Sequence, residues 1–246
     1  MDSLTHILTG AAIGQVFSTE KDRYRTLVWG AIAGSIPDLD AAIQLFLSPE
    51  SSMLFHRGLS HSLLLWALCS PLLALLINRI YKGDRHSYFK WLKISATAWF
   101  SHLALDLFNT YGTGIFEPFS HVRIAFDAVN VFDLLFLIPV LTASVFFIFI
   151  IKDQDRKSTL AVLVLLFSMS YMTFASLTKL ITETNAKIAL AKQSIYPDRL
   201  ISSPLPLSTL AWKIVAEDDN GFYTGVYYGF WKDKIHFDYL EKNRDL

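Results

Sequence analysis

The sequence contains a single cysteine, Cys69, which lies within an apolar run. One cysteine excludes a disulfide within the chain and does not identify the cellular compartment. The chain also lacks an excess of either charge, because 22 Lys and Arg residues balance 22 Asp and Glu residues. It has no basic patch interleaved with aromatic residues, so we expect no nucleic-acid partner.

The N-terminal stretch MDSLTHILTG lacks the basic region and the cleavage site of a signal peptide, so we expect residues 4–17 to remain in the mature protein. Apolar residues are abundant, at 52% of the 246 residues. A hydrocarbon core requires about 20 apolar residues per helix. This length predicts spans near residues 27–47, 62–80, 91–110, 131–151 and 159–180, with a shorter tilted or partial helix over 4–17. The fold class expected is therefore an all-α polytopic membrane protein with about five to six membrane helices.

The basic residues are distributed unevenly among the expected loops. Eleven Lys and Arg residues lie in segments 18–26, 79–93 and 152–158, whereas segments 48–61 and 111–130 carry one each, Arg57 and Arg123. Because cytoplasmic loops are enriched in basic residues, the first three segments are expected in the cytoplasm. The N-terminus and the chain after residue 181 are then expected outside it.

The C-terminal region differs from the rest in composition. Residues 182–246 continue from a helical stretch, through the proline-bounded link SSPLPLS, to two aromatic and β-branched runs that flank DDNG. This pattern predicts a β-hairpin closed by Asn220 and Gly221, since both residue types accept positive φ. We therefore expect a membrane-embedded domain over 1–181, and an extracytoplasmic helical extension with a small β-containing cap over 182–246.

Ionisable residues are expensive inside a membrane and usually face the bundle interior or a wet cavity. The expected topology gathers a set of them at the outer face: His6, Asp38, Asp40, His56, His61, His102, Asp106 and Asp133. Histidine nitrogens and carboxylates on adjacent helical turns suit zinc or another divalent metal. Their collection on one side predicts a metal site there.

Helical spacing sharpens this prediction. Two helix faces combine glycines with one ionisable residue at intervals of four: His6, Gly10, Gly14 and Gly30, Gly34, Asp38. Small residues allow close packing of helices, which would bring the two ionisable ends together. Pro37 is expected to push Ile36 toward extended geometry and interrupt the helix at SIPDLD.

Several of these residues also have structural interpretations. A lone His102-Asp106 pair is often only a helix hydrogen bond, and Asp133 is equally a helix cap or a ligand. His86, His121 and His236 fit loop or tail positions, and we leave them out of the site.

Four motifs, LTHILTGAAIG, GSIPDLD, HRGLSHSLL and HLALDLFNTYGT, occur in this order over residues 1–180. In this respect the chain resembles the YdjM-type family of bacterial membrane-bound, metal-dependent hydrolases. The resemblance implies a multi-pass protein of the bacterial inner membrane, with metal ligands at His6, Asp38, Asp40, His56, His61, His102 and Asp106. The aromatic tail of the chain resembles an extension found in some members of this family.

The leading hypothesis is a hydrolase that uses one or two divalent metals, zinc in the first instance, to activate water. The substrate expected is a lipid-linked ester or phosphoester at the outer face. Asp40 is the candidate base or bridging ligand. Arg57 would stabilise an anionic transition state, Arg123 is a weaker candidate, and Gly58 would allow the turn in HRGLSHS.

Two other functions fit the same residues. A zinc-dependent lipid amidase would share the water-activating chemistry without needing a cation for an anionic group. A non-enzymatic, metal-stabilised membrane scaffold or sensor would use the tail to bind a partner. The substrate headgroup and the oligomeric state have no signal in the sequence.

Overall fold

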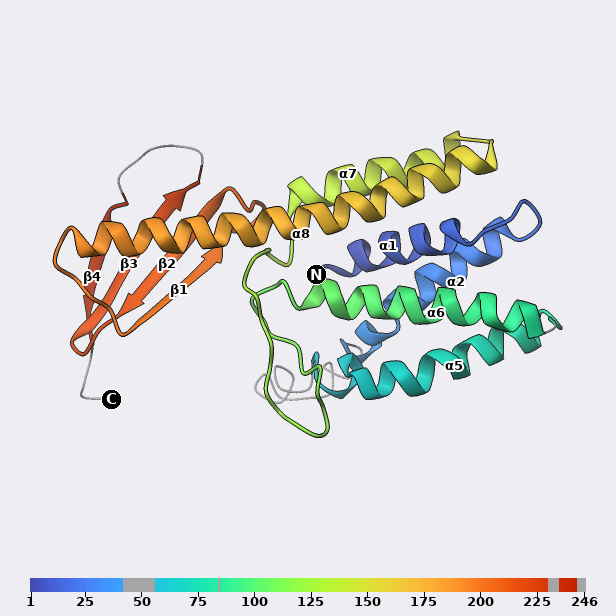
Figure 1. The fold of residues 1–246 in the computed structure, drawn as a ribbon, viewed down its shortest axis with the longest axis horizontal. Helices are drawn as coiled ribbons and strands as arrows, with labels where there is room; N and C mark the ends of the chain where they lie inside the picture. Colours follow the sequence, from blue (N-terminus) through green and yellow to red (C-terminus); the bar gives the residue numbers. More distant parts are fainter. Residues whose placement is uncertain (42–55, 84, 230–234, 243–246) are drawn as a thin grey trace.

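A computed structural model describes residues 1–41, 56–83, 85–229 and 235–242. Within these residues a group of helices is joined by one long helix to a four-stranded antiparallel sheet (Figure 1). Parts of the predicted span 27–47 and of the predicted loop 48–61 lie outside the described residues.

The first two helices, α1 (Ser3–Val16) and α2 (Arg23–Ser35), pack with their backbones almost in contact. A Cβ atom added to Gly10 would lie 2.4 Å from the carbonyl oxygen of Gly30, and one added to Gly34 would lie 2.7 Å from that of His6. Only glycine allows this approach. The predicted glycine-lined seam is confirmed.

Two short 3-10 helices follow, η1 (Pro37–Asp40) and η2 (Leu59–His61). The predicted interruption at Pro37 is confirmed, but its expected geometry is wrong. Ile36 keeps helical angles, with φ −56° and ψ −42°, so the chain tightens into a 3-10 turn instead of extending. The turn in HRGLSHS likewise places positive φ, at 60°, on Arg57 and not on Gly58.

The remaining helices are α5 (Leu63–Ile80), α6 (Arg85–Asp106), α7 (Leu134–Val145), which continues as the π-helical η3 (Phe146–Ile150), and α8 (Gln154–Ala191). A buried apolar cluster joins α7 and α8 to α1. Figure 1 shows the α1–α2, α5–α6 and α7–α8 connections at one end of the bundle, while the N-terminus and the end of α6 lie at the other.

Only two of the described helices, α5 and α8, are long and apolar enough to cross a membrane. The prediction of a polytopic all-α protein with five to six membrane helices is therefore wrong. Helix α2 has 13 residues, and α7 with its π-helical continuation reaches only from Leu134 to Ile150. Helix α6 is long enough but carries charged residues such as Lys90 and Lys93. Counting apolar residues overestimated the spans because it ignored where helices begin and end.

The sheet has the order β1-β2-β3-β4, with β1 (Arg199–Pro204), β2 (Ala211–Glu217), β3 (Gly221–Tyr228) and β4 (Phe237–Glu241). The second half of α8 packs against one face, where Ala186, Ile214 and Ile235 form a small core. The β-containing cap and the β2–β3 hairpin are confirmed.

The detail of the hairpin turn differs from the prediction. Gly221 already belongs to β3, and the Asp218 carboxylate accepts hydrogen bonds from the backbone N–H groups of Asn220 and Gly221. A Cβ atom on Gly221 would lie 2.4 Å from the carbonyl oxygen of Leu240. Glycine is therefore required by the close approach of β4, and not by a left-handed turn.

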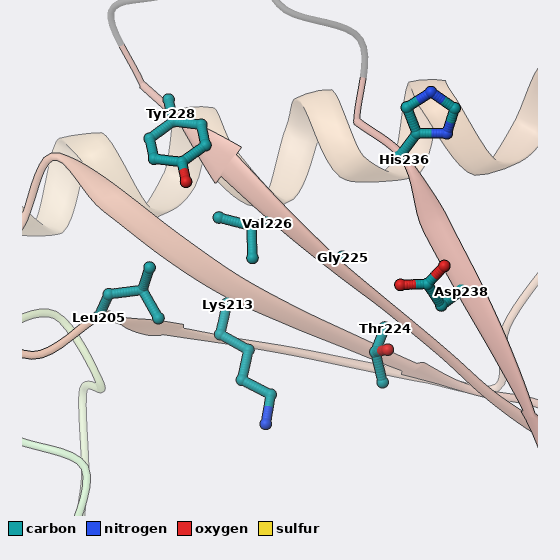
Figure 2. A pocket seen from close by; sticks show the side chains of 8 residues that line it. All are labelled: Leu205, Lys213, Thr224, Gly225, Val226, Tyr228, His236 and Asp238. Atoms are coloured by element: carbon teal, nitrogen blue, oxygen red, sulfur yellow. The ribbon is translucent and has the colours of Figure 1, made fainter.

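The other face of the sheet is hollowed. A depression of about 420 Å³ is lined by Leu205, Lys213, Thr224, Gly225, Val226, Tyr228, His236 and Asp238 (Figure 2). It contains His236, the histidine that the sequence assigned to the tail, and none of the predicted metal ligands. The predicted ligands Asp38, His61, His102 and Asp106 lie instead in η1, η2 and the end of α6.

Candidate metal centre

Four predicted ligands converge at the end of the bundle that contains the N-terminus. Asp38 comes from η1, His61 from η2, and His102 and Asp106 from the last turns of α6. Each offers one ligand atom, and the four atoms all lie within 4.8 Å of one another. Residues 38, 61 and 102 are far apart in the sequence, so the fold creates this group.

Five of the six distances between these atoms are close to those of a coordination shell. The Nε2 atoms of His61 and His102 lie 3.0 Å apart. Asp38 Oδ1 lies 3.7 Å from the first nitrogen and 3.5 Å from the second, and Asp106 Oδ2 lies 3.3 and 3.6 Å from them. Ligands about 2.1 Å from a tetrahedral metal lie about 3.4 Å apart. These five distances are close to that value, which suits ligands that share one divalent ion.

The contacts of the two Nδ1 atoms orient the imidazole rings so that their Nε2 atoms face the four-atom group. His102 Nδ1 lies 2.7 Å from the carbonyl oxygen of Gly34, which only accepts hydrogen bonds, so this nitrogen carries the proton. His61 Nδ1 lies 2.9 Å from Ser60 Oγ. Such outer partners orient histidine ligands in metal sites, and here they leave Nε2 of His102 with a free lone pair.

Asp40 lies on the opposite side of His61 from the four atoms. It accepts hydrogen bonds from Ser60 Oγ at 2.5 Å and from the Arg57 backbone N–H at 3.1 Å, while His56 Nδ1 lies 2.9 Å from its other oxygen. Burial raises the pKa of Asp40, but hydrogen bonds led by that of His56 outweigh it and hold the pKa well below its usual range. Asp40 is therefore a carboxylate that fixes the η2 segment.

Electrostatics at His61 favour a positive charge. Burial lowers the pKa of this imidazole, but its contacts with three carboxylates, led by Asp106, outweigh burial and raise the pKa to about 10. Asp38 and Asp40 lie against opposite nitrogens of the ring, at 3.7 and 3.5 Å. The surroundings that hold a proton here also suit a metal cation.

His6 lies beside the four-atom group without belonging to it. Its ring stacks on His102, with centroids 3.6 Å apart, and its Nε2 lies 3.3 Å from Asp106 Oδ1. Both ring nitrogens are buried and make no hydrogen bond within the part of the chain that the structure describes. The Met1 amino group and the Asn109 side-chain amide also approach Asp106 Oδ1. Asp106 thus directs one oxygen to the four-atom group and the other to His6.

Arg57 is a buried cation at the edge of the group. Its Nε lies 3.4 Å from Asp106 Oδ2, and its guanidinium lies over the ring of Tyr111. The residue is only 4% exposed, and its Nε and Nη1 make no hydrogen bond to any described residue. A left-handed backbone costs free energy in a residue with a long side chain, so the surroundings hold it in place.

The other candidates lie outside the group. His56 contacts Asp40 and is 29% exposed. Arg123 donates a hydrogen bond to the carbonyl oxygen of His56. Asp133 caps α7 by accepting from the N–H groups of the next turn and also accepts from Tyr171. Of its two predicted roles, the structure gives it that of a cap.

Three polar residues of this region were not identified from the sequence. Ser3 donates to Asp38 Oδ2 at 2.9 Å, Ser60 links Asp40 to His61, and Asn109 donates to Asp106 at 3.2 Å. Ser60 and Asn109 stand inside two of the four motifs, so their positions beside predicted ligands were the available signal.

The comparisons with known proteins agree with this picture. The model of a family described as "YdjM inner membrane protein" matches residues 1–180, which contain all four candidate ligands. The chain is also 28% identical over 146 residues to the uncharacterized protein YfhP of Bacillus subtilis (strain 168), an alignment that covers 54% of this chain and 42% of that protein. The chain thus spans less than half the length of this curated relative. No solved structure matches the chain. Since the family model covers most of the chain, the protein belongs to the YdjM inner membrane protein family.

Proposed function

We propose that the chain is a membrane-bound, metal-dependent hydrolase that cleaves a lipid-linked ester or phosphoester. The observation that carries the proposal is the convergence of Asp38, His61, His102 and Asp106. Membership of an inner membrane family and two apolar helices of spanning length support a location at the bilayer. A lipid substrate would reach such a site without leaving the membrane.

The donor set fits a divalent metal, with zinc as the first choice. Two imidazole nitrogens and two carboxylate oxygens are common ligands of zinc. Among the described residues Asp106 Oδ2 is buried without a hydrogen bond, which leaves its lone pairs available to a metal cation. His6, with two unpartnered nitrogens beside Asp106 Oδ1, is positioned to support a second ion. A bound divalent metal lowers the pKa of water from about 15.7 to about 7 and polarises the oxygen under attack.

Residues around the metal have separable roles in this proposal. Asp40 acts as a positioning residue, because hydrogen bonds from His56, Ser60 and the Arg57 backbone occupy its oxygens. Arg57 brings a buried positive charge, two nitrogens of which make no hydrogen bond within the described residues. A phosphoester gathers negative charge as it is attacked, so such a cation would stabilise the transition state more than the ground state. This feature favours a phosphoester over an amide.

The site is proposed to face away from the cytoplasm. The connections at the opposite end of the bundle (Figure 1), together with the first turns of the helices that follow them, carry Lys21, Arg23, Lys82, Arg85, Lys152 and Arg156. Because basic residues remain on the cytoplasmic side, the site and the C-terminal sheet would lie outside it. A reporter that is active only in the cytoplasm, fused after Leu246, is expected to be silent. Strong reporter activity would contradict this orientation.

The proposal is tested in two stages. Purified protein is analysed for bound metal, and the His61→Ala and His102→Ala variants are expected to lose it while His236→Ala retains it. Equal metal content in all three variants would reject the site. A lipid-extract screen then seeks a turnover that depends on the metal.

The active substrate then distinguishes the reaction classes. If a phosphoester is cleaved, Arg57→Ala should lower kcat by about 100-fold or more, as for loss of a transition-state donor. Lys213→Ala, which removes a cation from the sheet, is the matched control. Little loss with Arg57→Ala on an amide substrate would favour the amidase. Bound metal without turnover on any lipid would favour the scaffold or sensor.

A further inference from the structure

An apolar groove lies on the outer surface of α1 and α2, next to the metal centre. It has a volume of about 360 Å³ and is lined by Ile7, Ala31, Ile32, Ser35, Ile36 and Leu39. Five of these six residues are apolar. Ile7 and Ile32 are each 41% exposed and Leu39 is 66% exposed, so their side chains are available to a ligand.

The groove reaches the metal centre through two residues. Leu39 directly follows Asp38, one of the four candidate ligands. Ser3, which lies one helical turn before Ile7 on α1, donates a hydrogen bond to Asp38 Oδ2. The polar end of a molecule lying in the groove would therefore arrive at this carboxylate.

Exposure of the ligands also singles out this side. The side chain of Asp38 is 13% exposed, whereas those of His61, His102 and Asp106 are fully buried. Among the four candidate ligands, Asp38 is therefore the one that a substrate can approach from the surface. The groove begins next to it.

We propose that this groove holds one acyl chain of the lipid substrate and guides its headgroup linkage to the metal centre at Asp38. The inference rests on the proposed function, because it names the part of the substrate that the same site recognises. An acyl chain is favoured because the lining is apolar, its exposed side chains belong to a protein of a membrane family, and one lining residue, Leu39, is the chain neighbour of Asp38. The glycine seam beneath it keeps α1 and α2 together, so the groove is preformed.

The test uses the full-length protein in vesicles of phosphatidylethanolamine and phosphatidylglycerol, with a phosphatidylglycerol that carries a diazirine on one acyl chain. After illumination, mass spectrometry measures which residues are labelled. The groove residues are expected to be labelled several-fold more than the exposed apolar face of α5, which contains Leu68, Leu72 and Leu76. Equal labelling of both faces would overturn the inference, since it would mean ordinary contact with bulk lipid.

Two variants complete the test. Ile32→Trp fills the groove and should abolish the excess labelling, while Leu72→Trp adds the same bulk on α5 and should leave it unchanged. Both should retain metal, so a loss of label is not a loss of the centre. Persistent labelling in Ile32→Trp would contradict the inference.

Asp38→Asn separates this inference from the proposed function. It should weaken metal binding but retain excess labelling of the groove. Groove labelling without metal or turnover in the wild type would remove the hydrolase proposal and keep the lipid site. Bound metal and turnover, together with uniform labelling of the surface, would keep the hydrolase proposal and remove the acyl-chain groove.

Discussion

Two buried polar clusters lie at the same end of the helical bundle, and they differ in how completely their groups are paired. The joint cluster consists of Asp133, Tyr171 and Thr209. Asp133 accepts from Tyr171 Oη at 2.9 Å and from two backbone N–H groups, and Tyr171 Oη lies 2.7 Å from Thr209 Oγ1. Every one of these side chains has partners within the protein.

The metal centre contrasts with the joint cluster. Buried atoms of His6, Arg57 and Asp106 have no hydrogen-bond partner among the described residues. An unpaired buried polar group costs about 1–3 kcal/mol, and more when it is charged. These groups contact one another only as ion pairs at 3.3–3.4 Å, and several such groups in one place are typical of a ligand site. Pairing thus distinguishes the joint cluster from the candidate metal centre, although both contain buried aspartates.

The largest expected effect comes from exchanging a carboxylate for an amide in each cluster. Asp106→Asn should weaken metal binding by more than about 100-fold, because loss of an outer-shell partner alone costs about 10–100-fold. Asp133→Asn is the matched control, since it alters a buried aspartate at the same end of the molecule. Metal titration of both purified variants measures the contrast. Equal affinities would erase the distinction between the clusters.

The glycine seam provides the next test. Gly34→Leu should separate α1 from α2 near His6 and weaken metal binding by about 10-fold or more, within the range of outer-shell losses. Gly14→Leu introduces a comparable clash with Thr26 nearer the α1–α2 turn and should reduce stability more than metal binding. Metal per folded molecule is measured after size-exclusion chromatography. Full occupancy in folded Gly34→Leu would show that the seam serves packing alone.

A hydroxyl beside the centre should have a smaller effect. Ser60→Ala removes the group between Asp40 and His61 and should weaken metal binding about 10-fold, at the low end of outer-shell effects. Ser62→Ala, two residues later, removes the N-cap of α5 and should instead lower stability by about 1 kcal/mol. An unchanged metal affinity in Ser60→Ala would mean that Asp40 orients His61 without it.

The smallest expected effect concerns the joint cluster itself. Tyr171→Phe deletes the hydroxyl that contacts Asp133 and Thr209, so the free energy of unfolding should fall by about 1–2 kcal/mol. Metal affinity should not change. Thermal or denaturant unfolding and metal titration on the same preparation measure both quantities. A drop in metal affinity would show that the two clusters are coupled.

The site was more predictable than the number of membrane spans. His102 and Asp106 stand four residues apart, and helical periodicity alone places them on one face, where their ligand atoms lie 3.6 Å apart. The glycine intervals predicted the α1–α2 seam by the same reasoning. Hydropathy carried less information, because an apolar run in the sequence contains loop residues as well as the helix. The predicted span 27–47 illustrates this, because α2 ends at Ser35. In α6 the limit is a different one, since charged residues interrupt the apolar sequence.

Roles that depend on where a side chain points could not be predicted from the sequence. Asp38 and Asp40 are two residues apart, yet they contact opposite nitrogens of His61, so one belongs to the four-atom group and the other supports it. The spacing predicted their proximity but not this division. The left-handed backbone of Arg57 was also unexpected, since its neighbour Gly58 is the residue type that adopts such angles easily.

Helix α8 has a mechanical consequence. Its 38 residues, at a rise of about 1.5 Å each, make a rod of about 57 Å, whereas a hydrocarbon core is about 30 Å thick. The same unbroken helix packs on the bundle near Tyr171 and on the sheet near Ala186. Inserting one residue between these points would turn the sheet by about 100° relative to the bundle. The length of α8 therefore fixes both the distance of the sheet from the bundle and its rotation about the helix axis.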